Sequence, residues 1–543
     1  MKMESTVKAI ETDVLVIGAG PAGLGTAIAL MRGAPEGSKP RVIVLDKGRN
    51  PGSHILSGAI VDPSGFDGLL TQEETAKLPV EARVSKESFR MISGPGRSMK
   101  VPWVPPLMHS RGYPVGSLTK IVSYLASIAE REGVELYTGY AVTELLEENG
   151  RICGARTGAK GIGKDGGHKE NYLAPEEIRA RVTVLAEGGC GILTERLADE
   201  KGLRGKRCQT YALAIKELVE VPAGKQTAGE VMHTFGYPLT DGTYGGGFVY
   251  HISETQVMAG YVCALDYRRP EIDPHLLFRR FKESSAVRRH IEGGKTVAYG
   301  AKTIPEGGYY SALHPHTPGC VIVGDAAGLL DSLRIKGVHI ALQSAQAAAK
   351  AILAELKDGK GLETYPGLLH ATRGWKEMKR VRNVRAAFRH GTFCGVMGAG
   401  MAWATFGLFP FWRLGGFEKP DSEELEPLKP GALEKESARG VPQNSPLSPD
   451  RLTGVFMSGT LHDEDQPCHL KIADAAKCGE CREKYGAPCT RFCPAEVYRF
   501  EEDRLQIDFS NCLHCKTCKI KCPYGNVDWT FPQGGDGPRY TRM

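Results

Sequence analysis

The cysteines near the end of the chain have the spacing of metal ligands. Nine of the fifteen cysteines lie in the last 76 of the 543 residues. Clustering at CxxC spacing favours metal over disulfides in a chain without a secretion signal. Three thiolates at intervals of three residues wrap one face of an iron–sulfur cubane, whereas zinc sites use paired CxxC knuckles. The pattern C-x2-C-x2-C-x3-C-P is formed by Cys512, Cys515, Cys518 and Cys522.

The fourth ligand of such a cluster comes from elsewhere in the chain, and Cys493, also followed by proline, is the candidate. We therefore expect a 4Fe-4S cluster on Cys493, Cys512, Cys515 and Cys518. A second cluster on Cys478, Cys481, Cys489 and Cys522 is an open alternative, because C-x2-C-x7-C-x3-C-P mirrors the downstream run. Cys478 and Cys481 could instead hold zinc or be free thiols, and Cys468 stays unassigned.

The front of the chain carries a dinucleotide-binding pattern. An apolar run from Asp13 leads into a GxGxxG motif, a small-residue helix and a second apolar run that ends at Asp46. The first glycine allows a tight turn, the second lets the backbone approach a pyrophosphate, and the third lets helix and strand pack closely. An acid at this distance accepts ribose hydroxyls. The residues concerned are Gly18, Gly20, Gly23 and Asp46.

A second motif selects FAD as the nucleotide. Residues 319–342 read as a strand that ends in Gly324-Asp325, followed by a small-residue helix. This resembles the second FAD motif of the glutathione reductase-like flavoproteins. The resemblance implies that Asp325 binds the ribityl and pyrophosphate region and that the loop Ile335 to Gly337 lies near the flavin ring. The alternative is that Asp325 only caps a helix.

These motifs predict an α/β fold. We expect a glutathione reductase-like FAD-binding Rossmann domain, an inserted β-sheet domain that forms the substrate site and a C-terminal ferredoxin-like iron–sulfur domain. The expected segments are 1–200 and 301–390 for the FAD domain, 201–300 for the sheet, 391–416 for an apolar membrane segment, 417–450 for a linker and 451–543 for the cluster domain.

Charge and hydropathy bear on partners. A net charge of +6 is small for this length, so no nucleic-acid partner is expected. The first residues lack the apolar core of a signal peptide. Residues 393–412 carry no charge and could span a bilayer, lie in one leaflet or be buried. The basic stretch 371–390 would suit anionic lipid, and the apolar loop near 101–112 could dip into the membrane.

The chain resembles the electron transfer flavoprotein-ubiquinone oxidoreductase family. Stretches that carry the resemblance include LSGAIVDP (56–63), TYGGGFVYH (243–251), SGTLHDEDQPCHL (458–470) and NCLHCKTC (511–518). It implies one FAD, a 4Fe-4S cluster on the four cysteines given first above, and a quinone head against Gly245 and Gly246. It also implies electron transfer flavoprotein as donor, with the cluster and the FAD relaying electrons to quinone, and a peripheral or monotopic attachment to membrane lipid. We expect this attachment at the cytoplasmic face of the cell membrane.

Two departures from the family pattern matter. The family usually has aspartate where this chain has Cys522, and it usually lacks Cys478, Cys481 and Cys489. The motif VGDAAGLLDS (323–332) looks more like the bacterial branch and the geranylgeranyl reductases, so menaquinone is an alternative to ubiquinone as the expected acceptor. The rival hypotheses are an FAD-dependent isoprenoid reductase and an electron-relay subunit of a flavin-bifurcating, menaquinone-reducing complex.

Overall fold

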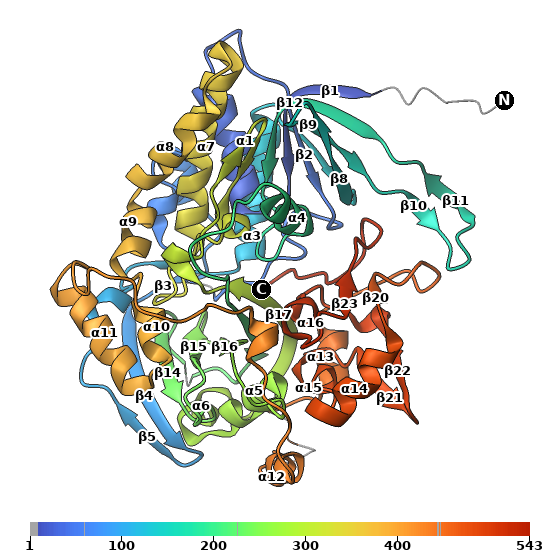
Figure 1. Cartoon of the computed structure of the whole chain (residues 1–543). Coiled ribbons are helices and arrows are strands. Elements are labelled where there is room, and N and C mark those ends of the chain that lie inside the picture. The colour runs from blue at the N-terminus through green and yellow to red at the C-terminus, as the bar shows by residue number, and fades with distance from the viewer. Residues whose placement is uncertain (1–8, 59, 225, 442–444, 446) are drawn as a thin grey trace.

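A computed structural model describes residues 9–58, 60–224, 226–441, 445 and 447–543. Residues 1–8 lie outside the described residues, and with them part of the stretch that lacks the apolar core of a signal peptide. Ala59 and parts of the linker lie outside them as well. The described chain forms two large sheets with helices, four two-stranded sheets and a C-terminal module that packs against the large sheets (Figure 1).

The first sheet is built from buried apolar strands that pair in parallel. Continuous runs of Val, Ile and Leu at 14–17 and 42–45 lie in this sheet and are buried, as expected where both faces of a sheet are covered. Its strands in spatial order are β18 (His316–Thr317), β19 (Cys320–Ile322), β12 (Glu177–Leu185), β1 (Ile10–Ile17), β2 (Val42–Asp46) and β7 (Glu135–Thr138). In addition, β9 (Arg151–Thr157) pairs antiparallel with β12, and β8 (Val142–Glu148) pairs antiparallel with β9.

Helix α1 (Pro21–Gly33) follows β1 directly and packs between α7 (Val338–Asp358) and α3 (Leu118–Arg131). Helices α8 (Tyr365–Ala371) and α9 (Arg373–Arg380) continue the layer beside α7 (Figure 1). The strand, glycine turn and helix order is that of a Rossmann unit. The expected α/β fold class is therefore confirmed.

The second sheet is antiparallel except for the parallel pair of β14 and β4. Strands β4 and β5 come from within residues 1–200, so this sheet is assembled from two distant parts of the chain. Its order is β17 (Lys295–Pro305), β13 (Tyr211–Glu220), β16 (Gln256–Ala264), β15 (Gly245–His251), β14 (Glu230–Gly236), β4 (Lys86–Gly94) and β5 (Arg97–Lys100).

The apolar segment begins after α10 (Val384–Phe388) as helix α11 (Thr392–Ala404) and continues as an irregular loop. In the described parts of the chain, no helix has both the length and the apolar character to cross a membrane. Most large side chains of the segment are exposed, so it is not a buried core segment.

Backbone oxygens of this segment are bound by side chains from the body. Arg380 donates to the Trp403 oxygen at 3.0 Å, and Asn383 donates to the Trp412 oxygen at 2.8 Å. Arg385 and Arg389 form ion pairs with Asp266 and Glu424. The arginines expected to face anionic lipid are therefore largely engaged within the protein.

The C-terminal module contains two short helices that each end at a cysteine followed by proline. Cys493 is the C-cap of α15, and Cys522 is the C-cap of α16. The module packs on β17, because Tyr299 donates to the Pro494 oxygen at 2.8 Å and Thr303 donates to the Cys515 oxygen at 2.7 Å. Its elements are α13 (Arg451–Met457), β20 (Leu470–Ile472), α14 (Ala475–Tyr485), α15 (Cys489–Phe492), β21 (Tyr498–Glu501), β22 (Arg504–Ile507), α16 (Thr517–Lys521) and β23 (Val527–Trp529).

The remaining elements connect these units. They are α2 (Gln72–Ala76), β3 (Ala82–Arg83), β6 (Pro114–Val115), β10 (Lys160–Ile162), β11 (His168–Leu173), α4 (Ile192–Glu200), α5 (Pro274–Glu283), α6 (Ser285–Ile291) and α12 (Ala432–Ala438).

Candidate flavin and iron–sulfur site

One cavity of about 530 Å³ joins motifs that are far apart in the sequence. The GxGxxG turn, Asp46 and Asp325 contribute to its wall. The Gly245-Gly246 pair of the second sheet, Lys516 and Trp529 of the C-terminal module, and Val396 of α11 also line it. The cavity therefore reaches from the Rossmann turn to the cysteine module and to the apolar segment.

The three glycines of the turn have different roles. Gly18 has a φ of +110°, and a Cβ there would lie 2.4 Å from the Ala186 oxygen. A Cβ on Gly23 would lie 1.9 Å from the Gly18 oxygen, so this glycine allows the helix to pack on the turn. A Cβ on Gly20 would meet only Ile55, at 3.7 Å, and would project into the cavity. Gly20 therefore leaves the space that a pyrophosphate needs.

Both acids of the FAD motifs lie at the cavity wall. Asp46 accepts hydrogen bonds from the backbone N–H groups of Ala19, at 2.7 Å, and Gly48, at 2.6 Å. Asp325 lies within a short 3-10 turn, η4 (Gly324–Ala327), whose N-cap is Val323, and α7 begins after Gly337. The helix-cap alternative for Asp325 is therefore not supported. Burial raises the pKa of Asp325 to about 6, although nearby Lys302 opposes the shift.

Gly324 and Gly337 complete the second motif. A Cβ on Gly324 would approach the Cβ of Ala22 on α1 to 2.8 Å, so this glycine permits close packing of the two FAD motifs. Gly337 lines the cavity, and a Cβ there would lie 3.1 Å from a carboxylate oxygen of Asp325. These residues would fit an FAD with its pyrophosphate at the Rossmann turn.

Three lysines from separate segments meet between the cavity and the cysteines. Burial lowers the pKa of Lys302 to about 8, and repulsion from Lys516 adds to this shift. Burial and the other two lysines lower the pKa of Lys47 well below its usual range. The ammonium groups of Lys47 and Lys516 lie 4.7 and 5.2 Å from the ring centre of Trp529. Because a nearby opposite charge favours the charged form of a lysine, this group of amines suits an anionic ligand such as a dinucleotide. The sequence motifs did not indicate these lysines.

The four cysteines expected to hold a cluster are buried and come together in the module. They form no disulfides. Burial raises the pKa of the Cys493 thiol to about 11, and the neighbouring Cys515 adds to the effect. Thr517 Oγ1 lies 3.3 Å from Cys515 Sγ, and the His514 N–H donates to Cys512 Sγ at 3.4 Å. Buried thiols with donors aimed at sulfur suit an iron–sulfur cluster, whose iron replaces the protons.

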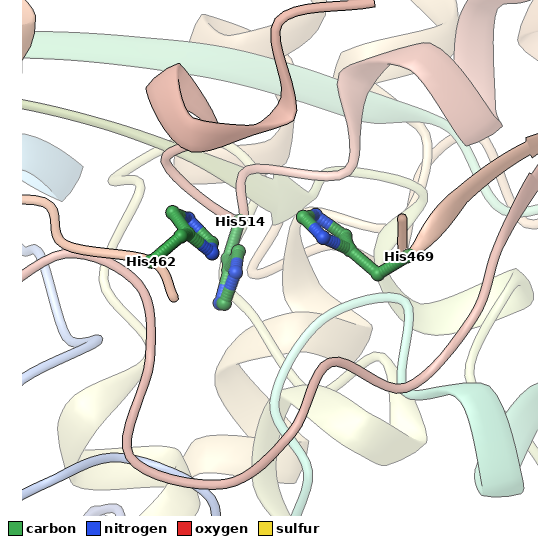
Figure 2. Close-up of side chains that lie close together, drawn as sticks. All are labelled: His462, His469 and His514. Atoms are coloured by element: carbon green, nitrogen blue, oxygen red, sulfur yellow. The ribbon is translucent and has the colours of Figure 1, made fainter. Parts of the chain in front are cut away.

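Three buried histidines cluster beside the cysteine loop. His462, His469 and His514 lie with ring centres 5.0 to 5.3 Å apart (Figure 2). The Trp529 ring meets His469 and His514 edge-on. The Nε2 atom of His462 lies 3.0 Å from the Cys512 oxygen. This contact engages one of the ring nitrogens that could otherwise bind a metal ion. We therefore interpret the three rings as an aromatic layer that supports the cysteine loop.

A hydrogen-bonded pair of side chains lines the cavity at the second sheet, as the Gly245-Gly246 pair does. Tyr250 Oη lies 2.7 Å from His233 Nε2, and both residues line the cavity. Burial lowers the pKa of His233 to about 3, so its imidazole is neutral at physiological pH. Gly245 and Gly246 lie on neighbouring β15, and a Cβ on Gly246 would lie 2.3 Å from the Thr234 oxygen. Tyr250 lies within the stretch 243–251 noted above, whereas nothing around His233 in the sequence indicated that the two side chains would pair.

The fold and the site define an iron–sulfur flavoprotein oxidoreductase. Residues 445–541 match the family model "Electron transfer flavoprotein-ubiquinone oxidoreductase, 4Fe-4S", and residues 211–304 match "ETF-QO, ubiquinone-binding". The mitochondrial electron transfer flavoprotein-ubiquinone oxidoreductase of Arabidopsis thaliana is 38% identical over 99% of this chain and 86% of its own length. That of Rattus norvegicus is 38% identical over 98% of this chain and 89% of its own. The chain belongs to the electron transfer flavoprotein-ubiquinone oxidoreductase family.

Solved structures support the fold. A geranylgeranyl bacteriochlorophyll reductase-like protein from Thermoplasma acidophilum aligns with a TM-score of 0.55 and 16% identity, over 80% of this chain and 98% of its own. A flavoprotein/dehydrogenase from Cytophaga hutchinsonii aligns with a TM-score of 0.51 and 17% identity, over 73% of this chain and 95% of its own. At these identities the likeness concerns the fold alone. The likeness to the reductase-like protein therefore does not favour the isoprenoid reductase hypothesis. The family match reported above favours neither that hypothesis nor the bifurcating subunit.

Proposed function

We propose that this chain oxidises reduced electron transfer flavoprotein and reduces a quinone to its quinol at a membrane surface. The observation that carries the proposal is the single cavity that links the FAD motifs, Gly245-Gly246, the cysteine module and the apolar segment. A quinone in this cavity would lie close to the flavin, and an isoprenoid tail could leave it along an apolar path. Two electrons and two protons convert each quinone to quinol.

The protein's own residues bind, orient and exclude water. Gly18, Gly20, Asp46 and Asp325 would hold FAD, and Cys493, Cys512, Cys515 and Cys518 would hold a 4Fe-4S cluster. These groups supply the electron-transfer chemistry when bound. The Tyr250–His233 pair holds a proton between its oxygen and Nε2 at the cavity wall, within the region where a quinone oxygen would need one.

The tail of the quinone would leave between α11 and the loop near 101–112. Met108 of that loop and Val396 of α11 both line the cavity. Leu107 packs in the same apolar cluster as Ala399 and Ala402 of α11. Ubiquinone and menaquinone share such a tail, so the cavity mouth suits either head group. We propose menaquinone as an acceptor beside ubiquinone.

The apolar segment supports attachment to membrane lipid. Its large side chains face outward while arginine and asparagine side chains bind its backbone oxygens, so few unsatisfied polar groups would enter lipid. We propose a peripheral or monotopic attachment at the cytoplasmic face of the cell membrane. The exposed residues are Phe393, Val396, Met397, Trp403, Phe406, Leu408, Phe409, Phe411 and Trp412, with Trp103 from the neighbouring loop.

The direct test mixes the holoprotein with reduced electron transfer flavoprotein and short-tailed benzoquinone or naphthoquinone analogues. Reoxidation of the donor with stoichiometric quinol formation is expected, and a preference for the naphthoquinone supports menaquinone. A reoxidised donor without quinol, or no reoxidation with either analogue, would contradict the proposed function.

The tail path has its own variant pair. Val396→Trp narrows the cavity mouth and is expected to slow a long-tailed quinone at least about tenfold while leaving a tail-less analogue unchanged. Met397→Trp is the matched control, because Met397 is equally exposed on the same helix and does not line the cavity. Equal rates for both variants with the long-tailed quinone would place the tail elsewhere.

A further inference from the structure

We propose that Cys478, Cys481, Cys489 and Cys522 hold a second 4Fe-4S cluster. The four residues line a common hollow on the outer side of the C-terminal module. Cys478 and Cys481 come from α14, Cys489 begins α15, and Cys522 caps α16. All four thiols are half-buried and none is in a disulfide.

The two short helices distribute their cysteines between two groups. Helix α15 has Cys489 at its start and Cys493 at its end, and α16 carries Cys518 and ends at Cys522. Cys493 and Cys518 face the inner group, whereas Cys489 and Cys522 line the outer hollow. The upstream run of cysteines, 478–493, thus contributes its last cysteine to the inner group. The downstream run, 512–522, contributes its last cysteine to the outer group. This crosswise arrangement is that of ferredoxins with two clusters.

The surroundings of the outer sulfurs suit a cluster. Asn526 donates from its backbone N–H to Cys522 Sγ and from its side chain to Cys478 Sγ, both at 3.3 Å. Asn526 is itself fixed by Asp474, whose N–H donates to the amide oxygen at 2.9 Å. Such donors stabilise sulfur that carries negative charge. The rest of the lining is mainly apolar and includes Ile472, Phe492, Phe500, Leu505 and Val527.

The spacing of the thiols favours a cluster over a single zinc ion. Four thiolates on one zinc at 2.3 Å lie about 3.8 Å apart. In the part of the chain that the structure describes, only the three histidines bring three ligand atoms within 4.8 Å of one another. In neither group of cysteines, therefore, do the sulfur atoms lie as close together as the ligands of a single zinc ion. The outer group shares this property with the inner group, for which the family implies a cubane.

The position of the outer group suggests where electrons enter. Helix α14 has no buried residue, whereas the inner cysteines are buried. A cubane exchanges one electron at a time, so the outer site would gain one from the reduced flavoprotein partner and lose one to the inner cluster, with no bond made or broken. This role rests on the proposed function, whereas the presence of the cluster does not.

Counting metal in anaerobically purified holoprotein tests the proposal. About eight irons and eight sulfides per chain are expected, against about four for one cluster. Cys481→Ala and Cys522→Asp are each expected to lose about four irons and to keep FAD and the spectrum of the inner cluster. Cys468→Ala is the matched control, since its half-buried thiol lies in the same module outside both groups. About four irons in the unsubstituted chain, or about one zinc lost in Cys481→Ala, would overturn the proposal.

Magnetic resonance gives a readout independent of the metal count. Two reduced clusters linked through α15 and α16 are expected to show a spin-coupled EPR signal after dithionite reduction. Cys481→Ala should convert it to the simple signal of one isolated cluster. A single uncoupled signal in both proteins with unchanged intensity would contradict a second cluster. Because dithionite replaces the protein donor, this result is independent of whether electron transfer flavoprotein is the partner.

Discussion

Single residues of the FAD motifs divide into those that make room for a ligand and those that let the protein pack. Gly20 borders open cavity, whereas Gly18 and Gly23 would clash with backbone oxygens if they carried a Cβ. The same motif thus combines a folding requirement with a binding requirement. The two can be separated by substitution.

Gly18→Ala should abolish flavin binding. A methyl group there would lie 2.4 Å from the Ala186 oxygen at a φ of +110°, so the turn that presents Gly20 must shift. The flavin-to-protein ratio after purification should fall at least about tenfold. Gly37→Ala is the control, because Gly37 also has positive φ, +83°, but nothing lies within 4 Å of its Cβ position. An equal loss of flavin in both variants would show that strain alone is responsible.

Asp325→Asn should stabilise the apoprotein and weaken FAD binding. Burial raises the pKa of Asp325 from 3.8 to about 6, so the folded state binds more protons than the unfolded state between these values. Below pH 3.8 Asp325 is protonated in both states and does not lower the free energy of unfolding. Above pH 6 it is ionised in both states and lowers the free energy of unfolding by at most about 3 kcal/mol.

The gain in unfolding free energy of the asparagine variant should therefore grow from near zero at pH 4 to its maximum above pH 6. Urea unfolding of both apoproteins at several pH values measures this difference. A gain that is the same at every pH would argue against ionised Asp325 as its source.

At the scale of elements, the apolar segment shows how an irregular loop can be presented to lipid. Helix α11 is followed by a loop whose oxygens at Gly407, Pro410 and Trp412 accept hydrogen bonds from Arg382 and Asn383. The basic stretch before it thereby fastens the segment to the body. Most of its arginine charge is used inside the protein and is not free for anionic headgroups.

Leu408→Ser combined with Phe411→Ser should weaken vesicle binding at least about tenfold. These side chains are 76% and 78% exposed, so each contributes roughly 2 kcal/mol on entering lipid and little to folding. Phe456→Ser is the control, since Phe456 is 86% exposed on α13 in the C-terminal module (Figure 1). Co-sedimentation with neutral vesicles measures binding. Equal weakening by Phe456→Ser would show that attachment is not specific to this segment.

At the scale of the whole molecule, the end of the chain returns to the first domain. The backbone oxygen of Met543 accepts hydrogen bonds from the hydroxyls of Ser117 and Thr119, both at 3.0 Å, at the start of α3. Tyr540 packs its ring under β17, where its hydroxyl accepts from the Ala301 N–H. The end of the chain therefore contacts both the FAD-binding unit, at the start of α3, and the second sheet, at β17.

Removing residues 541–543 should destabilise the protein without removing its cluster ligands. The loss of buried Met543 and two hydrogen bonds costs about 3 kcal/mol, so Tm should fall by about 3 °C in a protein of this length. Arg542→Ala, at an exposed position, should leave Tm unchanged. Calorimetry of the holoprotein measures both, and an unchanged Tm in the truncated protein would mean that this contact does not hold the units together.

Features encoded by neighbouring residues could be predicted from sequence. The strand, GxGxxG turn and helix depend on contacts within a few dozen residues, and the cysteine spacing restricts which thiols can share a cluster. For this reason the Rossmann fold, the need for FAD and the iron–sulfur module were predictable. The quinone-binding role came from resemblance to a family, since a glycine pair on a strand has no distinctive chemistry by itself.

Features built from distant segments required the tertiary structure. Lys47, Lys302 and Lys516 converge only because the module docks on β17, and β4 joins the second sheet from far upstream. Neither property leaves a periodic or spaced signal in the sequence, because each depends on surfaces that meet only after folding. The cysteine pattern determined that two groups of ligands were available. Only the packing of α14, α15 and α16 decided that Cys522 faces the outer hollow beside Cys478.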